Sequence, residues 1–339
     1  MTDESALLQR ARAGDDSAFE ELVAPYRAQL QAHCYRLLAS AHDADDALQD
    51  ALIGAWRGIG GFEGRSSLRG WLYRIATNAA LRVVAGRPRR LLSLDVAPAC
   101  TDPSALGDPL DGPVWVEPYP AERVDAISVD PASAYDAREA VELAFVAALQ
   151  HLPPSQRAVL LLRDVLGFTA AETAETLDLS VAAVNSRLQR ARATLARRLP
   201  DRTQQAVRAE LGAEAERRLV ADLVAAWEAR DVEAFVAVLV NDARLSMPPL
   251  PAWFDGAEAI RGFLARMFET PWTVQVTSAN GQPALVCWQG DPEGTTYRLG
   301  GLTVLTLRAG RVAALTCFLA PMVEDLVVTT DESGSPRDS

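Results

Sequence analysis

The sequence predicts a multidomain protein with two all-α domains followed by an α+β domain. Apolar residues recur at the three-to-four residue spacing of helices in residues 1–92 and 135–203. Residues 204–328 begin with the same helical spacing and then change to strand-like segments separated by turn residues. Between the two helical parts, residues 93–134 are rich in proline and poor in periodic apolar positions. A chain of 339 residues is long enough for this division.

The charge of the chain is unevenly distributed. The net charge is −12, and every basic residue is arginine. Residues 1–92 and 136–200 are each close to neutral, whereas residues 93–135 and 201–339 carry most of the acidic excess. An acidic total is unusual for a protein that holds DNA by charge alone. The two helical domains, considered separately, are not excluded from binding DNA.

Composition also narrows the classes of protein. A hydrophobic content of 49% supports folded cores and argues against a disordered chain. Neither an apolar run of about 20 residues nor a signal-peptide core is found, so we expect a cytoplasmic protein. The four cysteines are scattered and form no C-x-x-C pair, so we expect no disulfide framework, metal site or cofactor.

The first domain, residues 1–92, is expected to contain three main helices. Residues 15–40 and 43–59 have helical apolar spacing, and the second segment places acids on a face of its own. The segment "SSLRGWLYRIATNAALRVV" follows a glycine-rich turn, with Ser66 or Ser67 as its N-cap. Pro88 in "GRPRR" ends this helix.

Residues 93–134 are interpreted as an acidic, proline-rich linker. The stretch "VWVEPYP", residues 114–120, is too aromatic for a neutral spacer, and exposed aromatic side chains in a linker usually have a partner.

The second domain, residues 135–203, is predicted to contain a helix-turn-helix. Thr169 and Glu172 form a T-x-x-E capping box, and Ser180 caps the longer helix after a short turn. Val181, Val184, Leu188, Ala191 and Leu195 should line the buried face of that helix. An ordinary amphipathic surface helix is the alternative, but the preceding capped helix and turn favour DNA recognition.

Residues 204–328 are predicted to be α+β. Helical patterns cover 213–229, 232–240 and 257–268, and strand patterns cover 272–279, 282–290, 295–308 and 311–319. Helices followed by a curled antiparallel sheet give an α+β unit. Residues 329–339 are expected to form a disordered tail.

The helical domains resemble the two conserved domains of bacterial sigma factors of the extracytoplasmic-function group. The first carries "DADDALQDALIGAWRGIGGF" and "SLRGWLYRIATNAA", which are similar to the family's acidic helix and its W-L-x-x-I-x-x-N helix. The second carries "LPPSQRAVLLLRDVLGFTAAETAETLDLSVAAVNSRLQRARATL", with the family's L-P-x-x-Q-R start and V-x-S-R-L-x-R-A-R helix. The resemblance implies a promoter-specificity subunit of RNA polymerase.

The resemblance implies roles for individual residues of the first domain. The acidic helix would dock on the clamp helices of the largest polymerase subunit through Asp43, Asp46, Gln49 and Asp50. Acids near a helix start also suit the helix dipole alone, so Gln49 and Asp50 indicate docking most clearly. The next turn and helix would open the minus-ten element and hold a flipped base. Its candidate residues are Phe62, Arg65, Ser67, Arg69, Arg74, Asn78 and Arg82. Trp71 is interpreted as a core residue, and Arg87, Arg89 and Arg90 as phosphate contacts by type.

The resemblance implies that the second domain reads the minus-thirty-five element in the major groove and contacts the polymerase flap. Its candidate base contacts are Asn185, Ser186, Gln189 and Arg190, and its candidate phosphate contacts are Arg187, Arg192 and Arg197. The family usually has a basic residue at the position of Asn185, which puts the preferred base in doubt. Element centres lie ~70–80 Å apart. A free linker of about 42 residues averages only ~35 Å but can extend to ~140 Å. Polymerase must therefore hold the linker extended.

The C-terminal third resembles the polyketide-cyclase-like, SnoaL-like branch of the NTF2-like superfamily through "WEARDVEAFVAVLVNDARLSMPPLPAWFDGAEAIRGFL". The resemblance implies a cone-shaped α+β domain. Sigma factors with such a domain often carry W-x-E-P-Y-P in the linker, which residues 115–120 match. A pocket for an unknown small ligand could be lined by Trp227, Met247, Trp253, Phe263, Trp288 and Phe318, or these side chains could simply fill the core. Catalysis is not expected, because all three histidines precede this domain.

Three functions remain open from the sequence. The first is a sigma factor controlled in cis by its C-terminal domain. The second is a stand-alone helix-turn-helix regulator with a ligand-sensing domain, which would leave the two helices of the first domain without a role. The third is a SnoaL-like enzyme with a DNA-binding front end.

Overall fold

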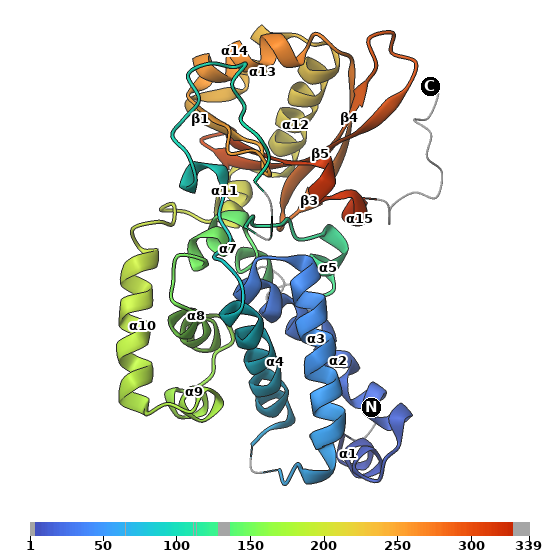
Figure 1. Cartoon of the computed structure of the whole chain (residues 1–339), viewed down its shortest axis with the longest axis vertical. Helices are drawn as coiled ribbons and strands as arrows, with labels where there is room; N and C mark the ends of the chain where they lie inside the picture. The colour runs from blue at the N-terminus through green and yellow to red at the C-terminus, as the bar shows by residue number, and fades with distance from the viewer. Residues whose placement is uncertain (1–3, 65, 111, 113, 128–135, 328–339) are drawn as a thin grey trace. The chain divides into compact units, whose positions relative to one another are not determined.

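The computed structural model describes residues 4–64, 66–110, 112, 114–127 and 136–327. The chain divides into two compact units (Figure 1). Unit 1 comprises residues 1–90 and 122–200, and unit 2 comprises residues 91–121 and 201–339. The predicted disordered tail, 329–339, lies outside the described residues.

Unit 1 is all-α. Its N-terminal half contains α1 (Glu4–Arg12), α2 (Asp16–Leu38), α3 (Ala41–Gly58), the 3-10 turn η1 (Ile59–Gly61) and α4 (Leu68–Ala85). Its second half contains α5 (Ala121–Asp125, whose first residue falls in unit 2), α7 (Leu143–Leu149), α8 (Pro154–Leu160), the π-turn η3 (Leu161–Val165), α9 (Ala170–Leu177) and α10 (Val181–Leu195). The short 3-10 turn η2 (Ser93–Asp95) follows residue 90 and belongs to unit 2.

Local capping explains where these helices begin. Ser67 is the N-cap of α4, and its hydroxyl accepts a hydrogen bond from the Gly70 amide at 3.1 Å. The predicted capping box of α9 is present, with Thr169 and Glu172 each accepting a hydrogen bond from the other's amide. Asp178, the first of the three residues between α9 and α10, has left-handed φ (53°), which turns the chain sharply. The helix-turn-helix prediction for this segment is confirmed.

Unit 2 is α+β and contains a six-stranded sheet with the order β2-β1-β6-β5-β4-β3. The strands are β1 (Leu239–Ser246), β2 (Trp253–Asp255), β3 (Trp272–Ala279), β4 (Gln282–Gly290), β5 (Tyr297–Arg308) and β6 (Arg311–Leu319). Its helices are α11 (Gln204–Leu211), α12 (Ala213–Glu228), α13 (Val232–Ala237), α14 (Ala257–Met267) and α15 (Glu324–Val327), with the 3-10 turn η4 (Ala320–Met322). The pair β1–β6 is parallel and the other pairs are antiparallel.

Two strands were not predicted. The helical pattern assigned to 232–240 ends at Ala237, and Leu239 begins β1. The apolar run at 238–240 fits either state by periodicity. Strand pairing decides that this run is a strand, because β1 pairs with β2 on one side and with β6, near the end of the chain, on the other. Helices α12 and α14 then pack on the sheet to form one apolar core.

The residues interpreted as a linker are partly built into unit 2. Leu91 forms a β-bridge with Trp115, and its amide donates to the Val114 carbonyl at 2.8 Å. The Tyr119 amide donates to the Asn280 side-chain oxygen at 2.9 Å, and the Asn280 amide donates to the Tyr119 carbonyl at 2.8 Å. Trp115 and Tyr119 are 3% and 1% exposed. The aromatic stretch therefore has its partner in unit 2.

Candidate polymerase and promoter interfaces

The acidic helix α3 presents part of the predicted docking set to solvent. Asp46, Gln49 and Asp50 are exposed. Asp43 is different, because its carboxylate is 2% exposed and lies 2.5 Å from both the Arg87 and Arg90 guanidinium groups. Asp43, which the sequence analysis places in the docking set, is therefore not accessible to a docking partner in this structure. Instead, the Asp43 carboxylate, in the first turn of α3, pairs with the arginines of the segment that follows α4 and holds that segment in place.

Helix α4 arranges three of the predicted minus-ten residues in one exposed row. Arg74, Asn78 and Arg82 are four residues apart and all exposed, so they share a helix face. Ser67 is exposed but is occupied as the N-cap. Phe62 is 7% exposed and packs on Trp71, with ring centroids 5.1 Å apart. Phe62 is thus a core residue here, not a surface for a flipped base.

The predicted minus-ten residue Arg69 contacts the second half of unit 1. Its guanidinium donates to the Leu166 carbonyl at 3.0 Å and lies 4.7 Å from the centroid of the Phe168 ring. The Phe168 ring also meets Tyr73 of α4 edge-on. Arg65 lies outside the described residues.

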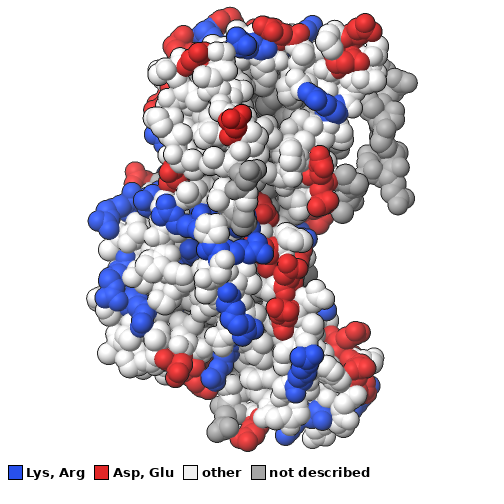
Figure 2. Space-filling model, viewed as in Figure 1, with Lys and Arg blue, Asp and Glu red and all other residues white. Residues whose placement is uncertain are grey.

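Helix α10 exposes the predicted recognition residues. Asn185, Gln189, Arg190, Arg192 and Arg197 are exposed, and Ser186 and Arg187 are half-buried. The opposite face buries Val184, Leu188, Ala191 and Leu195, as predicted, but Val181 is 45% exposed because it lies in the first turn, beyond that core. Basic side chains gather over the part of unit 1 that contains α10 (Figure 2).

Two of these side chains already have partners. Arg192 makes a bidentate pair with Asp164, at 2.8 and 2.7 Å. The Arg190 guanidinium donates to the Ser186 hydroxyl at 2.8 Å. Among the predicted base contacts in the described part of the chain, Asn185 and Gln189 are therefore exposed and have no side-chain hydrogen bond, whereas Arg190 and Ser186 bond to each other.

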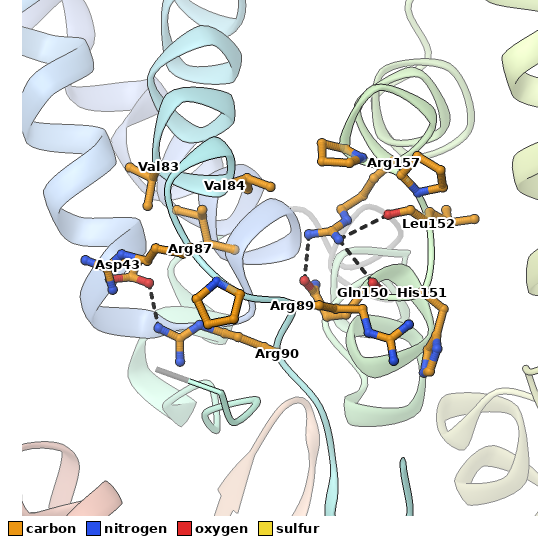
Figure 3. Close-up of a pocket in the computed structure, with 14 residues that line it drawn as sticks. Asp43, Val83, Val84, Arg87, Arg89, Arg90, Gln150, His151, Leu152 and Arg157 are labelled. Carbon is orange, nitrogen blue, oxygen red and sulfur yellow. Dashed lines mark hydrogen bonds and ion pairs between the residues drawn. The ribbon is translucent and has the colours of Figure 1, made fainter. Parts of the chain in front are cut away.

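A basic cavity of about 320 Å³ lies between the two halves of unit 1 (Figure 3). It is lined by Arg87, Arg89 and Arg90 after α4, and by residues 150–154 and Arg157. Arg87 and Arg90 turn toward Asp43, whereas Arg89 lies on the side of His151 in Figure 3. Arginines assigned to phosphates from the sequence thus surround a cavity in this structure.

Arg157 joins the two halves of unit 1. Its place in the L-P-x-x-Q-R pattern did not predict this role. It is 4% exposed and donates to the Leu37 carbonyl at the end of α2. It also donates to the Gln150 side-chain oxygen at 2.6 Å and to the Leu152 carbonyl at 3.3 Å. Burial, with a smaller effect of the Arg89 charge, lowers the pKa of Arg157 to about 10.

A second cavity, of about 360 Å³, lies within unit 2. Three of the predicted pocket residues line it: Trp227, Met247 and Phe263. Trp288 and Phe318 do not, because the preceding strand residues, Cys287 and Cys317, line the cavity and successive side chains point to opposite faces. Trp253 is also outside the lining, and its indole N–H donates to the Ala97 carbonyl at 2.8 Å.

The described residues contain no cluster of three or more His, Cys, Asp or Glu side chains arranged to hold a metal ion. Within the same part of the chain, no helix has both the length and the apolar content to cross a membrane.

Comparisons with known proteins agree with this architecture. Residues 22–90 match the model of sigma-70 region 2, residues 142–195 match sigma-70 region 4, and residues 220–315 match the SnoaL-like domain. The solved structure of the Mycobacterium tuberculosis extracytoplasmic function sigma factor SigJ is similar in fold. It has a TM-score of 0.57 at 22% identity, over 88% of this chain and 95% of that one.

Curated relatives share more of the sequence. The chain is 42% identical to the ECF RNA polymerase sigma factor SigG of Mycobacterium tuberculosis, over 91% of this chain and 82% of that protein. It is 35% identical to the ECF RNA polymerase sigma factor SigM of the same species, over 58% of this chain and 84% of that protein. The chain therefore belongs to the extracytoplasmic-function RNA polymerase sigma factors and carries a fused SnoaL-like domain.

Proposed function

We propose that this sigma factor binds core RNA polymerase through the exposed Asp46, Gln49 and Asp50 face of α3. The row Arg74, Asn78 and Arg82 on α4 contacts the minus-ten element, and α10 reads the minus-thirty-five element through Asn185 and Gln189. The protein works in the cytoplasm, where polymerase and promoter DNA are found. Polymerase supplies most of the affinity for the complex, which explains how a chain of net charge −12 can act on DNA.

The observation that carries the mechanism is the contact of α4 with the second half of unit 1. Arg69 is held by the Leu166 carbonyl and the Phe168 ring, and Arg74 lies 3.9 Å from Glu175 of α9. Promoter elements ~70–80 Å apart cannot be occupied by two domains in direct contact. The described arrangement is therefore a closed, resting state, and promoter engagement separates region 2 from region 4.

Unit 2 controls this separation in cis and is not catalytic. Three carboxylates that could serve an acid-base reaction are paired with arginines: Asp242 with Arg308, Asp255 with Arg244 and Glu258 with Arg261. None of the three lines the cavity of unit 2. Residues 91–121 give unit 2 its means of control, since they belong to the segment between the two sigma domains and are hydrogen-bonded to the rest of unit 2.

The test is run-off transcription from a randomised promoter library, with core polymerase and the full chain. We expect initiation from a defined pair of elements, and a changed preference only at the minus-thirty-five element in Asn185→Ala. Initiation should fail when core polymerase is added without this chain. If the chain instead bound one DNA sequence tightly without polymerase and directed no initiation, the stand-alone regulator would be the correct function.

A further inference from the structure

The cavity of unit 2 is walled partly by the segment that joins the two sigma domains. Pro103, Ser104 and Leu106 line it together with side chains of α12, α14 and the sheet. Leu106 also packs against the apolar core of unit 2. The linker therefore forms part of the cavity wall and does not only run along the outside of unit 2.

The chemistry of the cavity is that of a site for an apolar molecule. The charged residues among its lining are Arg266 and Glu269, and both are exposed. The inner wall contains Phe235, Leu245, Leu264 and the thiols of Cys287 and Cys317. Burial raises the pKa of Cys317 to about 11 and that of Cys287 further, so both thiols are neutral at pH 7. A volume of about 360 Å³ lies within the range of small-molecule pockets, ~300–1,000 Å³.

One buried donor borders this space. The indole N–H of Trp227 has no hydrogen-bond partner in the described part of the chain, although the side chain is 3% exposed. The indole N–H of Trp272, which also lines the cavity, donates to the Met267 carbonyl at 3.0 Å. A buried donor left unpaired costs roughly 1–3 kcal/mol. An acceptor atom on a bound molecule would remove that cost.

The linker is held on unit 2 at points on both sides of the cavity wall. The Ser93 hydroxyl donates to the Leu250 carbonyl at 2.9 Å, and the Cys100 amide donates to the Trp253 carbonyl at 2.8 Å. On the other side, the Leu110 amide donates to the Pro249 carbonyl at 3.1 Å. Residues 247 and 250, in the loop that receives these bonds, line the cavity as well. A molecule in the cavity would therefore contact both the linker residues and the loop that holds the linker on unit 2.

Docking also shortens the linker. Because Leu91 is bridged to Trp115, the chain between them begins and ends within the width of a strand pair, ~5 Å. Residues 116–120 are also held, through the Val116 amide, the Tyr119–Asn280 pair and the Pro120–Ala279 bridge. Residues 121–134 then remain to extend, which is ~50 Å of chain. Released, residues 93–134 can extend to ~140 Å. The promoter spacing of ~70–80 Å lies between these two lengths.

We propose that the cavity of unit 2 binds an uncharged, largely apolar small molecule with one hydrogen-bond acceptor, and that its binding holds the linker docked. The molecule contacts Pro103, Ser104 and Leu106 only while the linker is in place, so it favours the docked state by linkage. Occupancy therefore lowers initiation. This consequence rests on the proposed function, whereas binding and linker docking do not.

The first experiment titrates the full chain with N-phenyl-1-naphthylamine, an uncharged apolar probe whose fluorescence rises in apolar sites. We expect saturable binding of one probe per chain. Cys317→Phe and Leu106→Trp, which add volume from the sheet and from the linker, should each weaken it at least tenfold. Val276→Phe is the matched control, since Val276 is 56% exposed on β3 and is not among the lining residues. Absence of saturable binding to the unmodified chain would overturn the proposal.

The second experiment measures hydrogen exchange of the Leu91, Cys100, Leu110 and Val116 amides, which are bonded in the docked linker. Probe at 100 times its Kd should slow their exchange by up to ~100-fold if it binds only the docked state. Unchanged or faster exchange at saturation would overturn the coupling. The filled variants should show no response to the probe, and circular dichroism establishes that they are folded.

Run-off transcription then separates the two proposals. A chain that initiates without probe, and initiates less with probe, supports both. A chain that never initiates, yet binds probe and protects the four amides, contradicts the proposed function and leaves the ligand site standing. Normal initiation that saturating probe does not change overturns the regulatory consequence.

Discussion

The guanidinium of Arg69, on the helix assigned to the minus-ten element, donates to the carbonyl oxygen of Leu166 at 3.0 Å, just before the helix-turn-helix. It also lies 5.0 Å from the Tyr73 ring and 4.7 Å from the Phe168 ring. A side chain expected to meet DNA thus holds region 4 against region 2. If Arg69 contacts the minus-ten element, it must first leave the Leu166 carbonyl and the Phe168 ring.

Arg69→Ala should loosen the closed form of unit 1. It removes a charge-assisted hydrogen bond and a contact between a cation and two aromatic rings. We expect amide exchange in residues 162–177 to accelerate about tenfold, equivalent to ~1.4 kcal/mol. Arg74→Ala is the control, because its pair with Glu175 is long (3.9 Å) and exposed, and such pairs contribute little. Equal acceleration in both variants would contradict the role assigned to Arg69.

The buried imidazole of His33 should make the stability of unit 1 depend on pH. Its Nε2 lies 2.8 Å from the Thr77 hydroxyl, which itself donates to the Tyr73 carbonyl, so Nε2 carries the proton and donates. Burial, reinforced by the charges of Arg36 and Arg69, lowers the pKa of His33 to about 3. The unfolded chain, with a pKa of ~6.5, binds a proton that the folded chain does not.

Stability should therefore fall as pH falls from about 6.5 toward 3, by roughly 1.4 kcal/mol per pH unit from this group. Urea unfolding of the full chain at several pH values measures the slope. His33→Gln should flatten it, while His42→Gln, at an exposed position, should not. A slope that is unchanged in His33→Gln would assign the pH dependence to other groups.

The exposed acids of α3, Asp46 and Asp50, should respond to substitution differently from the buried Asp43. Asp46→Arg with Asp50→Arg should weaken the affinity for core polymerase at least tenfold without lowering the unfolding free energy by more than ~1 kcal/mol, because both are exposed. Asp43→Asn should instead destabilise unit 1 by about 3 kcal/mol, since it removes the buried negative charge that faces the Arg87 and Arg90 guanidinium groups. Fluorescence anisotropy with labelled polymerase and thermal unfolding separate the two effects. Weakened docking by a fully folded Asp43→Asn chain would restore Asp43 to the docking surface.

Helix α10 should contain separate residues for specificity and for affinity. Asn185→Ala should cost about 1–3 kcal/mol of discrimination at one base of the minus-thirty-five element, measured by initiation from single-base promoter variants. Arg197→Ala should weaken all promoters alike and reduce the salt dependence of binding by about one counterion. If Asn185→Ala lowered initiation equally from every promoter variant, the prediction that Asn185 contacts a specific base would be wrong.

The sequence by itself determined the main helices of unit 1, the caps of α9 and α10, and the identity of the three domains. Helical spacing, the Thr169–Glu172 box and the Ser180 cap are set by residues a few positions apart, so they can be recognised without tertiary information. The exposed face of α10 follows from the same spacing. Strands β1 and β2 could not be recognised in this way, because the partner of β1 is β6, about 70 residues later.

Only the tertiary structure decided which polar residues are available and what the linker does. Asp43 and Asp46 look alike in sequence, but the chain after α4 returns two arginines to Asp43 and buries it. Composition marked residues 93–134 as a spacer, yet the Leu91–Trp115 bridge and the Tyr119–Asn280 pair build part of it into unit 2. Burial and pairing of this kind depend on residues distant in the chain, and local pattern carries no information about them.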